Sequence, residues 1–248
     1  FVGIDADKTA LNKDKLEDSQ ATVHLVNDNF SHITDVLETL KIESVDGILA
    51  DLGWRMEQFS DSGKGFSFQN DEPLYMTFGE PDDYPFTVED ILNEWEEHVI
   101  ADILYGYANE RFARRIAKAV IRERKIARIA TTKQLVEVVE GALPRAALHR
   151  KTHPATKTFQ ALRIAVNDEL TVLETFIAQA FEALNVGGKL AIITFHSIED
   201  RIVKHTFREL KQAGVALLTP KKPISPSREE IIENPRARSA KLRVLTKQ

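Results

Sequence analysis

An apolar run that ends abruptly in a carboxylate constrains the fold of this chain more than any other feature. The run is Ile48-Leu49-Ala50, and Asp51 and the flexible Leu52-Gly53 step follow it directly. Short apolar runs of this kind are typical of buried strands in α/β sheets. Because ligands of open α/β sheets bind at the carboxyl ends of the strands, we expect Asp51 to lie in a binding site.

Strand-like and helix-like segments alternate ahead of this run. Phe1-Val2-Gly3-Ile4 has the pattern of a strand that ends at Asp5, residues 22–26 that of a second strand, and residues 31–41 that of a helix capped by Ser31. The alternation favours an α/β fold with a parallel sheet. The first strand has no turn, cap or helix before it, so we expect a further segment upstream of Phe1.

The two strand-end acids, Asp5 and Asp51, are the strongest chemical signal in the chain. Carboxylates at the ends of parallel strands can accept hydrogen bonds from ribose hydroxyls and from an amine. The alternative is that each acid only caps a helix or forms a turn. His196-Ser197 also follows a predicted strand, but it lacks the Gly-x-Ser-x-Gly pattern of a serine hydrolase.

The alternation is interrupted after Gln58. Residues 59–86 form a loop-rich segment, and helical patterns follow, the first opened by Thr87 with Asp90 in capping-box position. We therefore predict a core domain of residues 1–81 and 153–248 with a helical domain, 82–152, inserted into it. Within the second half of the core, the apolar period over 155–184 predicts one long helix, and strands are expected at 189–195, 215–218 and 242–246.

The composition excludes several classes of protein. The chain has no cysteine, which rules out disulfides, thiolate zinc sites and cysteine nucleophiles, and it has no apolar run long enough to cross a membrane. Its histidines show no metal-ligand spacing, so we expect no metal. Nothing at the start of the chain resembles a signal peptide, which favours a cytoplasmic setting.

Charge is strongly segregated along a chain whose net charge is only -5. Residues 71–102 hold eleven acidic and no basic side chains, whereas residues 111–128 hold eight basic side chains and one acid. The ranges 144–163 and 235–248 contain no acid. Such basic patches can bind a phosphate backbone, although a solvated helix face is an equal alternative for any one of them.

Six motifs, met in order along nearly the whole chain, carry a family resemblance. They are Asp46-Gly-Ile-Leu-Ala-Asp-Leu-Gly, Gly65-Phe-Ser-Phe, Glu110-Arg-Phe-Ala-Arg-Arg-Ile-Ala, His153-Pro-Ala-Thr-Lys-Thr-Phe-Gln-Ala-Leu-Arg-Ile-Ala-Val-Asn-Asp-Glu-Leu, Phe195-His-Ser-Ile-Glu-Asp-Arg-Ile-Val-Lys and Asn234-Pro-Arg-Ala-Arg-Ser-Ala-Lys-Leu-Arg. Together they resemble the bacterial methyltransferases (the ribosomal RNA small subunit methyltransferase H family) that methylate the N4 amine of a cytosine in small-subunit ribosomal RNA.

The resemblance implies a class I methyltransferase (Rossmann-like) sheet with an inserted small helical domain, whose first strand and Gly-rich loop lie upstream of Phe1. It implies S-adenosylmethionine as cofactor and small-subunit ribosomal RNA, or the assembling small subunit, as partner, without a membrane. Matching motif positions give the donor-binding residues Asp5, Phe30, Asp51 and Gln58. Asp51 is our candidate catalytic residue, as acceptor for the target amine.

For the RNA, we expect phosphate contacts from arginines of the basic patches. These are Arg111, Arg114, Arg115, Arg163, Arg236 and Arg238.

Two other functions stay open at this level. A catalytically inactive RNA- or ribosome-binding protein on the same scaffold is an alternative because residues 54–57 and 75–78 depart from the family pattern. An unrelated nucleotide-dependent oxidoreductase would explain the sheet but none of the six motifs.

Overall fold

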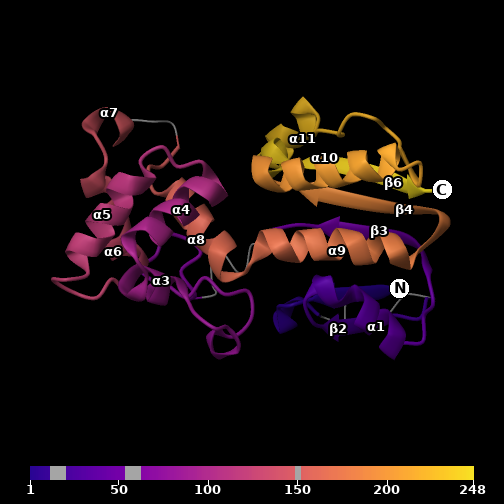
Figure 1. The fold of residues 1–248 in the computed structure, drawn as a ribbon, viewed down its shortest axis with the longest axis horizontal. Coiled ribbons are helices and arrows are strands. Elements are labelled where there is room, and N and C mark those ends of the chain that lie inside the picture. The colour runs from indigo at the N-terminus through magenta and orange to yellow at the C-terminus, as the bar shows by residue number, and fades with distance from the viewer. Residues whose placement is uncertain (12–20, 54–62, 149–151) are drawn as a thin grey trace. The chain divides into compact units, whose positions relative to one another are not determined.

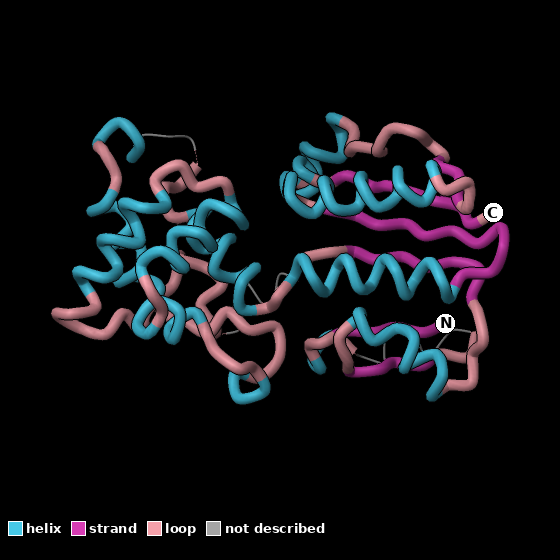
Figure 2. Tube along the Cα trace, viewed as in Figure 1, coloured by secondary structure: helices cyan, strands magenta, loops and turns pink. Residues whose placement is uncertain are grey.

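The computed structural model describes residues 1–11, 21–53, 63–148 and 152–248, which form two compact units. The sheet unit is Phe1–Gly53 with Leu170–Gln248, and the helical unit is Trp54–Glu169. All the named strands belong to the sheet unit (Figure 2). The helical unit is larger than the range 82–152 expected from sequence, because Leu74 on one side and Phe159 and Leu162 on the other are part of its core.

The sheet unit contains two sheets. In the first, β1 (Val2–Asp5) lies parallel to β2 (His24–Asn27). In the second, the strand order is β3-β4-β6-β5. The other elements of the unit are η1 (Lys8–Ala10), η3 (Phe30–His32), α1 (Ile33–Thr39), β3 (Val45–Asp51), α9 (Glu169–Ala183), β4 (Leu184–Thr194), α10 (Ser197–Gln212), β5 (Ala216–Leu218), α11 (Arg228–Glu233), η5 (Pro235–Ser239) and β6 (Lys241–Lys247).

The direction of the strands follows from their pairing and from the termini. β3 and β4 are parallel, with Asp51 opposite Ile193, and β6 is antiparallel to β4. The N-terminus, where β1 begins, and the C-terminus, beyond the end of β6, lie on the same side of this unit (Figure 1). Consequently β1, β2, β3 and β4 all end on the opposite side, which confirms the α/β fold with parallel strands.

One apolar core holds both sheets together. Phe176 and Ile177 of α9, Ile192 of β4 and Phe207 of α10 belong to one buried cluster, which also includes Ile33 and Leu37 of α1. Strand β3 is less buried than the sequence predicts. Ile48 and Ala50 pack against this core, but Leu49 points the other way and is 68% exposed, because successive strand residues face opposite sides of the sheet.

Local capping explains where the first helix begins. The sequence predicted Ser31 as the cap of a helix over 31–41, and this was wrong. Asn29 accepts a hydrogen bond from the Ser31 amide (3.0 Å), which starts the 3-10 turn η3, and α1 begins only at Ile33. Asn at a cap satisfies an amide that has no partner inside the helix.

The helical unit packs its helices around a second core. Its elements are η4 (Pro81–Asp83), α3 (Val88–Glu94), α4 (Glu97–Ala108), α5 (Ala113–Glu123), α6 (Thr132–Ala142), α7 (Arg145–Leu148) and α8 (Thr156–Val166). The predicted capping box of Thr87 and Asp90 is confirmed at the start of α3. Leu74 and Met76, the second of which lies within the departing segment 75–78, are buried in this core.

The long helix predicted over 155–184 is two helices. The break lies at Asn167 and Asp168, and Asp168 has a left-handed backbone with φ of 44°. The Asn167 side chain accepts from the Phe78 amide (2.9 Å) and donates to the Met76 carbonyl (2.7 Å). These tertiary contacts hold the break in place. Within the described residues, no helix combines the length and apolarity that crossing a bilayer would require.

Candidate active site

Four parallel strands deliver polar residues to one side of the sheet unit. Asp5 ends β1, Asn27 ends β2, Asp51 ends β3, and Phe195-His196 follows β4. Asp5 lies opposite Asn27 in the first sheet, and Asp51 lies opposite Ile193 in the second. Ligands of open α/β sheets bind at such carboxyl ends. Both strand-end acids predicted from sequence are therefore in one region of the fold.

Asp5 is held by a hydrogen-bonded turn. Its Oδ1 accepts from the Asp7 amide at 2.8 Å. The Asn27 side chain, from the neighbouring strand, donates to the carbonyls of Asp5 and Ala6, both at 3.0 Å. Asn27 was not selected from sequence, although its place in Asn27-Asp28-Asn29 directly after a strand is a detectable signal. The turn fixes the direction in which Asp5 presents its carboxylate.

Phe30 lies on η3 beside this turn. Its ring packs edge to face on Phe176 of α9, with ring centroids 5.0 Å apart and an interplanar angle of 83°. The ring is only partly buried, so part of it stays accessible. Next to it, Asp28 accepts from the Asn29 amide (2.7 Å) and lies 2.7 Å from the His32 ring nitrogen. An apolar ring surface and acceptor groups thus occur together at the end of β2.

Asp51 is the last residue of β3. The next amide, of Leu52, donates to the Ile193 carbonyl at 3.1 Å, which ties the strand end to β4. Gly53 then turns the chain with a positive φ of 104°, and a Cβ there would lie 3.6 Å from the Phe195 ring. Desolvation by the surrounding protein raises the pKa of the Asp51 carboxyl above its ordinary value, although the residue remains exposed. A carboxylate with raised proton affinity is a good acceptor for an N–H group.

The His196-Ser197 segment has a structural task. The His196 ring accepts from the Glu199 amide (3.4 Å), and the Glu199 carboxylate accepts from the amides of Phe195 (2.9 Å) and His196 (3.2 Å). This arrangement is a capping box at the start of α10. It places the strand-to-helix turn beside Asp51 and gives no support to a serine nucleophile.

The other predicted residues lie in several parts of the chain. Gln58 lies outside the described residues. Arg111, Arg114 and Arg115 are exposed at and just before the start of α5, in the helical unit, and Arg236 and Arg238 are exposed on η5, in the sheet unit. Arg163 differs from these exposed arginines, because only 4% of it is exposed to solvent. Its guanidinium donates two hydrogen bonds to the Glu169 carboxylate. We therefore remove Arg163 from the expected phosphate contacts.

Comparison with known proteins gives one consistent result. The MraW methylase family matches the chain over residues 1–248. A protein from Brevibacillus brevis named ribosomal RNA small subunit methyltransferase H is 41% identical over the whole chain and 83% of its own length. A protein of the same name from Oenococcus oeni is 44% identical over 98% of this chain and 81% of its own length. Another, from Clostridioides difficile, is 40% identical over 100% of this chain and 84% of its own length.

These matches cover both units and the strand ends at Asp5 and Asp51, and they give the α/β sheet its class, that of the class I methyltransferases. The chain belongs to the MraW methylase family.

Proposed function

We propose that this protein transfers a methyl group from S-adenosylmethionine to the N4 amine of a cytosine in small-subunit ribosomal RNA, in the cytoplasm. The observation that carries the proposal is the position of Asp5 and Asp51 at the carboxyl ends of parallel strands, with Phe30 shortly after the end of β2, in a methylase family. The name shared by the similar proteins supports the RNA substrate.

The chemistry of these residues fits the donor. Asp5, fixed by its turn, supplies an acceptor for ribose hydroxyls, and Asp28 offers a second carboxylate next to it. The Phe30 ring, braced by Phe176, supplies an apolar surface for the adenine. Asp51 supplies an acceptor for the amino group of the methionine end or for the target amine. When bound, S-adenosylmethionine supplies an electrophilic methyl group on its sulfonium.

Asp51 has the properties needed at the target amine. The N4 lone pair of cytosine is conjugated with the ring, and methylation develops positive charge on that nitrogen. A carboxylate that accepts a hydrogen bond from the amine stabilises this charge and receives the proton that must leave. The raised pKa of Asp51 strengthens it for both tasks. In our proposal, alignment of the two reactants by the strand ends supplies the remainder of the rate enhancement.

For the RNA backbone we propose contacts from the exposed arginines of both units. Arg111, Arg114 and Arg115 have no acidic partner among the described residues, and Arg236 and Arg238 share this property. Phosphates are the partners that such unpaired guanidinium groups favour.

Two measurements test the function together. Calorimetric titration with S-adenosylmethionine should give one saturable site, and single-turnover transfer of a labelled methyl group to small-subunit RNA should give N4-methylcytosine on mass analysis. Asp51→Asn should lower the rate of transfer roughly 100-fold or more. The matched control is Asp46→Asn on the same strand, where Asn can still accept the hydrogen bond from Asn185 (2.8 Å). Absence of donor binding, or transfer by Asp51→Asn at the wild-type rate, contradicts the proposal.

A further inference from the structure

A small basic pocket lies in the sheet unit, away from the residues assigned to the methyl donor. It has a volume of about 80 Å³ and lies between α10, the loop after β5, and β6. Its rim carries Lys204 and Arg208 from α10 and Lys221 and Lys222 from the loop. Lys204 and Arg208 are four residues apart on one helix, so both side chains lie on the same helical face.

The pocket joins an apolar floor to a cationic rim. Phe207, which is 2% exposed, Leu218 and Val244 contribute apolar atoms. Arg243 also lines the pocket, but its charge is balanced by Asp200, whose Oδ1 lies 2.7 Å from the Arg243 Nε. The four rim cations have no ion-pair partner in the described part of the chain. Their charge is available to a ligand.

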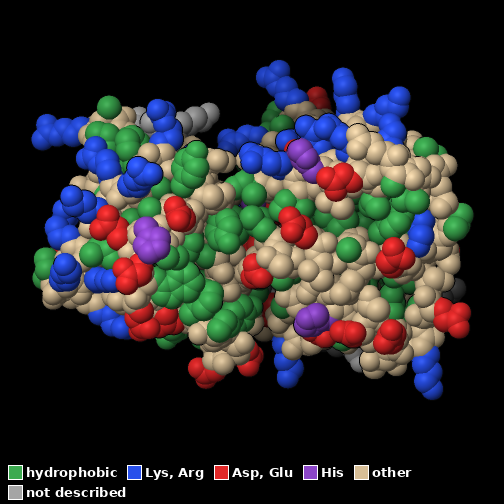
Figure 3. Space-filling model, in the orientation of Figure 1, with side chains coloured by type: hydrophobic (Ala, Val, Ile, Leu, Met, Phe, Trp, Pro, Cys, Tyr) green, Lys and Arg blue, Asp and Glu red, His purple; other side chains and the backbone are tan. Residues whose placement is uncertain are grey.

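The surrounding sequence amplifies this charge. Residues 201–222 hold six Lys or Arg and one acid, Glu209, in a chain whose net charge is -5. In the view of Figure 3, Lys and Arg side chains of the sheet unit gather over α10 and α11. A local excess of one sign in an acidic protein attracts a polyanion and orients it on approach.

The strand register relates the pocket to Asp51. Arg243 pairs with Ile192 of β4, and Ile192 pairs with Ala50 of β3, the residue just before Asp51. The pocket is therefore level with Asp51 along the strands. Since neighbouring strands are about 4.8 Å apart, β6 lies about 10 Å from β3 across the sheet. A few nucleotides are enough to cover this separation.

We propose that this pocket binds the RNA chain beside the target nucleotide, with phosphates on the Lys204, Arg208, Lys221 and Lys222 rim and a sugar or base over the apolar floor. The proposal rests on the function proposed above and adds a contact surface to it. Single-stranded RNA is the partner that fits, because its backbone is anionic and its unpaired bases offer faces to an apolar surface.

The test compares double variants of matched charge. Lys221→Gln/Lys222→Gln and Lys204→Gln/Arg208→Gln each remove two rim cations, and Gln keeps the helix propensity of α10. The control is Lys41→Gln/Lys189→Gln, which removes two exposed lysines from the sheet unit, one before β3 and one in the middle of β4. Binding of a labelled single-stranded fragment of small-subunit RNA is measured by fluorescence anisotropy over a range of salt concentrations.

Each rim variant should weaken RNA binding roughly tenfold at 0.15 M salt, and the slope of log K against log salt should fall by about 1.4 for two lost contacts. The control should keep the wild-type slope. Affinity for S-adenosylmethionine, measured by titration, should be unchanged in all three, so failure of the donor site is recognised separately. Wild-type slopes in both rim variants would overturn the proposal and would point instead to a protein partner for this surface.

Discussion

The guanidinium of Arg163 and the carboxylate of Glu169 form a two-point ion pair, with Nε to Oε1 at 2.6 Å and Nη2 to Oε2 at 2.7 Å. The pair joins α8 to the first residue of α9 across the break at Asn167 and Asp168. Only 5% of the Arg163 side chain and 10% of the Glu169 side chain are exposed. A charged pair so far out of water depends on both members being present.

Removal of one partner should therefore be costly. Glu169→Ala leaves the Arg163 charge buried, and we expect the free energy of unfolding to fall by about 3–5 kcal/mol, measured by urea denaturation. Glu123→Ala is the control, because its pair with Arg122 has an Arg122 side chain that is 66% exposed. That loss should stay below about 1 kcal/mol. Equal losses in the two variants would contradict the role given to the buried pair.

The carboxylate of Asp200 gives a pH dependence with a definite sign. Burial raises its pKa, but hydrogen bonds and charges from Arg243 and Lys241 outweigh this, so the pKa lies below the ordinary 3.8. Above pH 3.8 the carboxylate is charged in both folded and unfolded protein, and its stabilisation is complete. As the pH falls below 3.8, the unfolded state binds the proton first and the stabilisation is lost.

Asp200→Asn should accordingly lower the melting temperature by a constant amount at neutral pH and by less below pH 3.8. Thermal unfolding of both proteins, followed by circular dichroism from pH 7 to pH 3, measures the difference. A difference that grows toward acid pH would show that the carboxylate is not held in its charged form.

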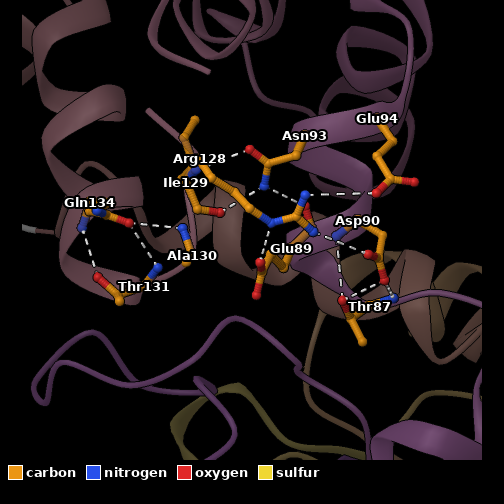
Figure 4. A network of polar contacts seen from close by, with 10 residues as sticks. All are labelled: Thr87, Glu89, Asp90, Asn93, Glu94, Arg128, Ile129, Ala130, Thr131 and Gln134. Atoms are coloured by element: carbon orange, nitrogen blue, oxygen red, sulfur yellow. Dashed lines mark hydrogen bonds and ion pairs between the residues drawn. The ribbon is translucent and has the colours of Figure 1, made fainter. Parts of the chain in front are cut away.

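In the helical unit, the Asn93 side chain serves as the hydrogen-bond partner of the Ile129 backbone (Figure 4). The side chain donates to the Ile129 carbonyl (2.9 Å) and accepts from the Ile129 amide (3.0 Å). Asn93→Ala leaves the amide and the carbonyl of Ile129 without partners, and Ile129 is only 3% exposed. We therefore expect the free energy of unfolding, measured by urea denaturation, to fall by about 1–3 kcal/mol.

The same network contains an internal comparison. Arg128 pairs with Glu89 and Asp90, but its side chain is 53% exposed. Arg128→Ala should therefore cost at most about 1 kcal/mol. If Arg128→Ala proved the more damaging variant, charge rather than backbone satisfaction would be what holds α3 to this loop.

Gly65, the first residue of the Gly65-Phe-Ser-Phe motif, has a steric reason to be glycine. Its φ is 78°, and an added Cβ would lie 2.3 Å from the Pro73 carbonyl oxygen. Gly63 also has a positive φ, of 62°, but nothing lies within 4 Å of its Cβ position. Gly63→Ala should therefore lower the free energy of unfolding by about 1–2 kcal/mol, because alanine disfavours the left-handed backbone. Gly65→Ala should lower it by the same amount and by about 1–3 kcal/mol in addition, because its Cβ clashes with Pro73. Equal melting temperatures for the two variants would refute the steric explanation.

Local signals predicted a good part of this fold. The strand that ends at Asp51, the Thr87 capping box and the strands near residues 216 and 242 depend on neighbours in sequence, and the structure confirms them. The break after Val166 could not be predicted in this way. The apolar period runs through it without interruption, and the groups that hold Asn167, at Met76 and Phe78, lie about ninety residues earlier in the chain.

In the candidate site, too, residues in local patterns could be predicted, whereas contacts between distant parts of the chain could not. Asp5 and Asp51 could be found because a strand end is a local pattern, and the site that the resemblance added around them stays a proposal. Arg163 looked like part of a basic patch because sequence records its charge but not its partner, Glu169. Conversely, Lys204 and Lys221 belong to one pocket only because β5 and its loop fold back along α10.

The pairing of β3 with β4 also sets an order of events during synthesis. The two strands lie on either side of the helical unit in sequence, so all of that unit leaves the ribosome before β4 does. Helices joined by local contacts form faster than a sheet joined by distant ones. The helical unit is therefore free to fold while β3 waits for its partner, and completion of the strand end at Asp51 is a late, slow step that depends on the last third of the chain.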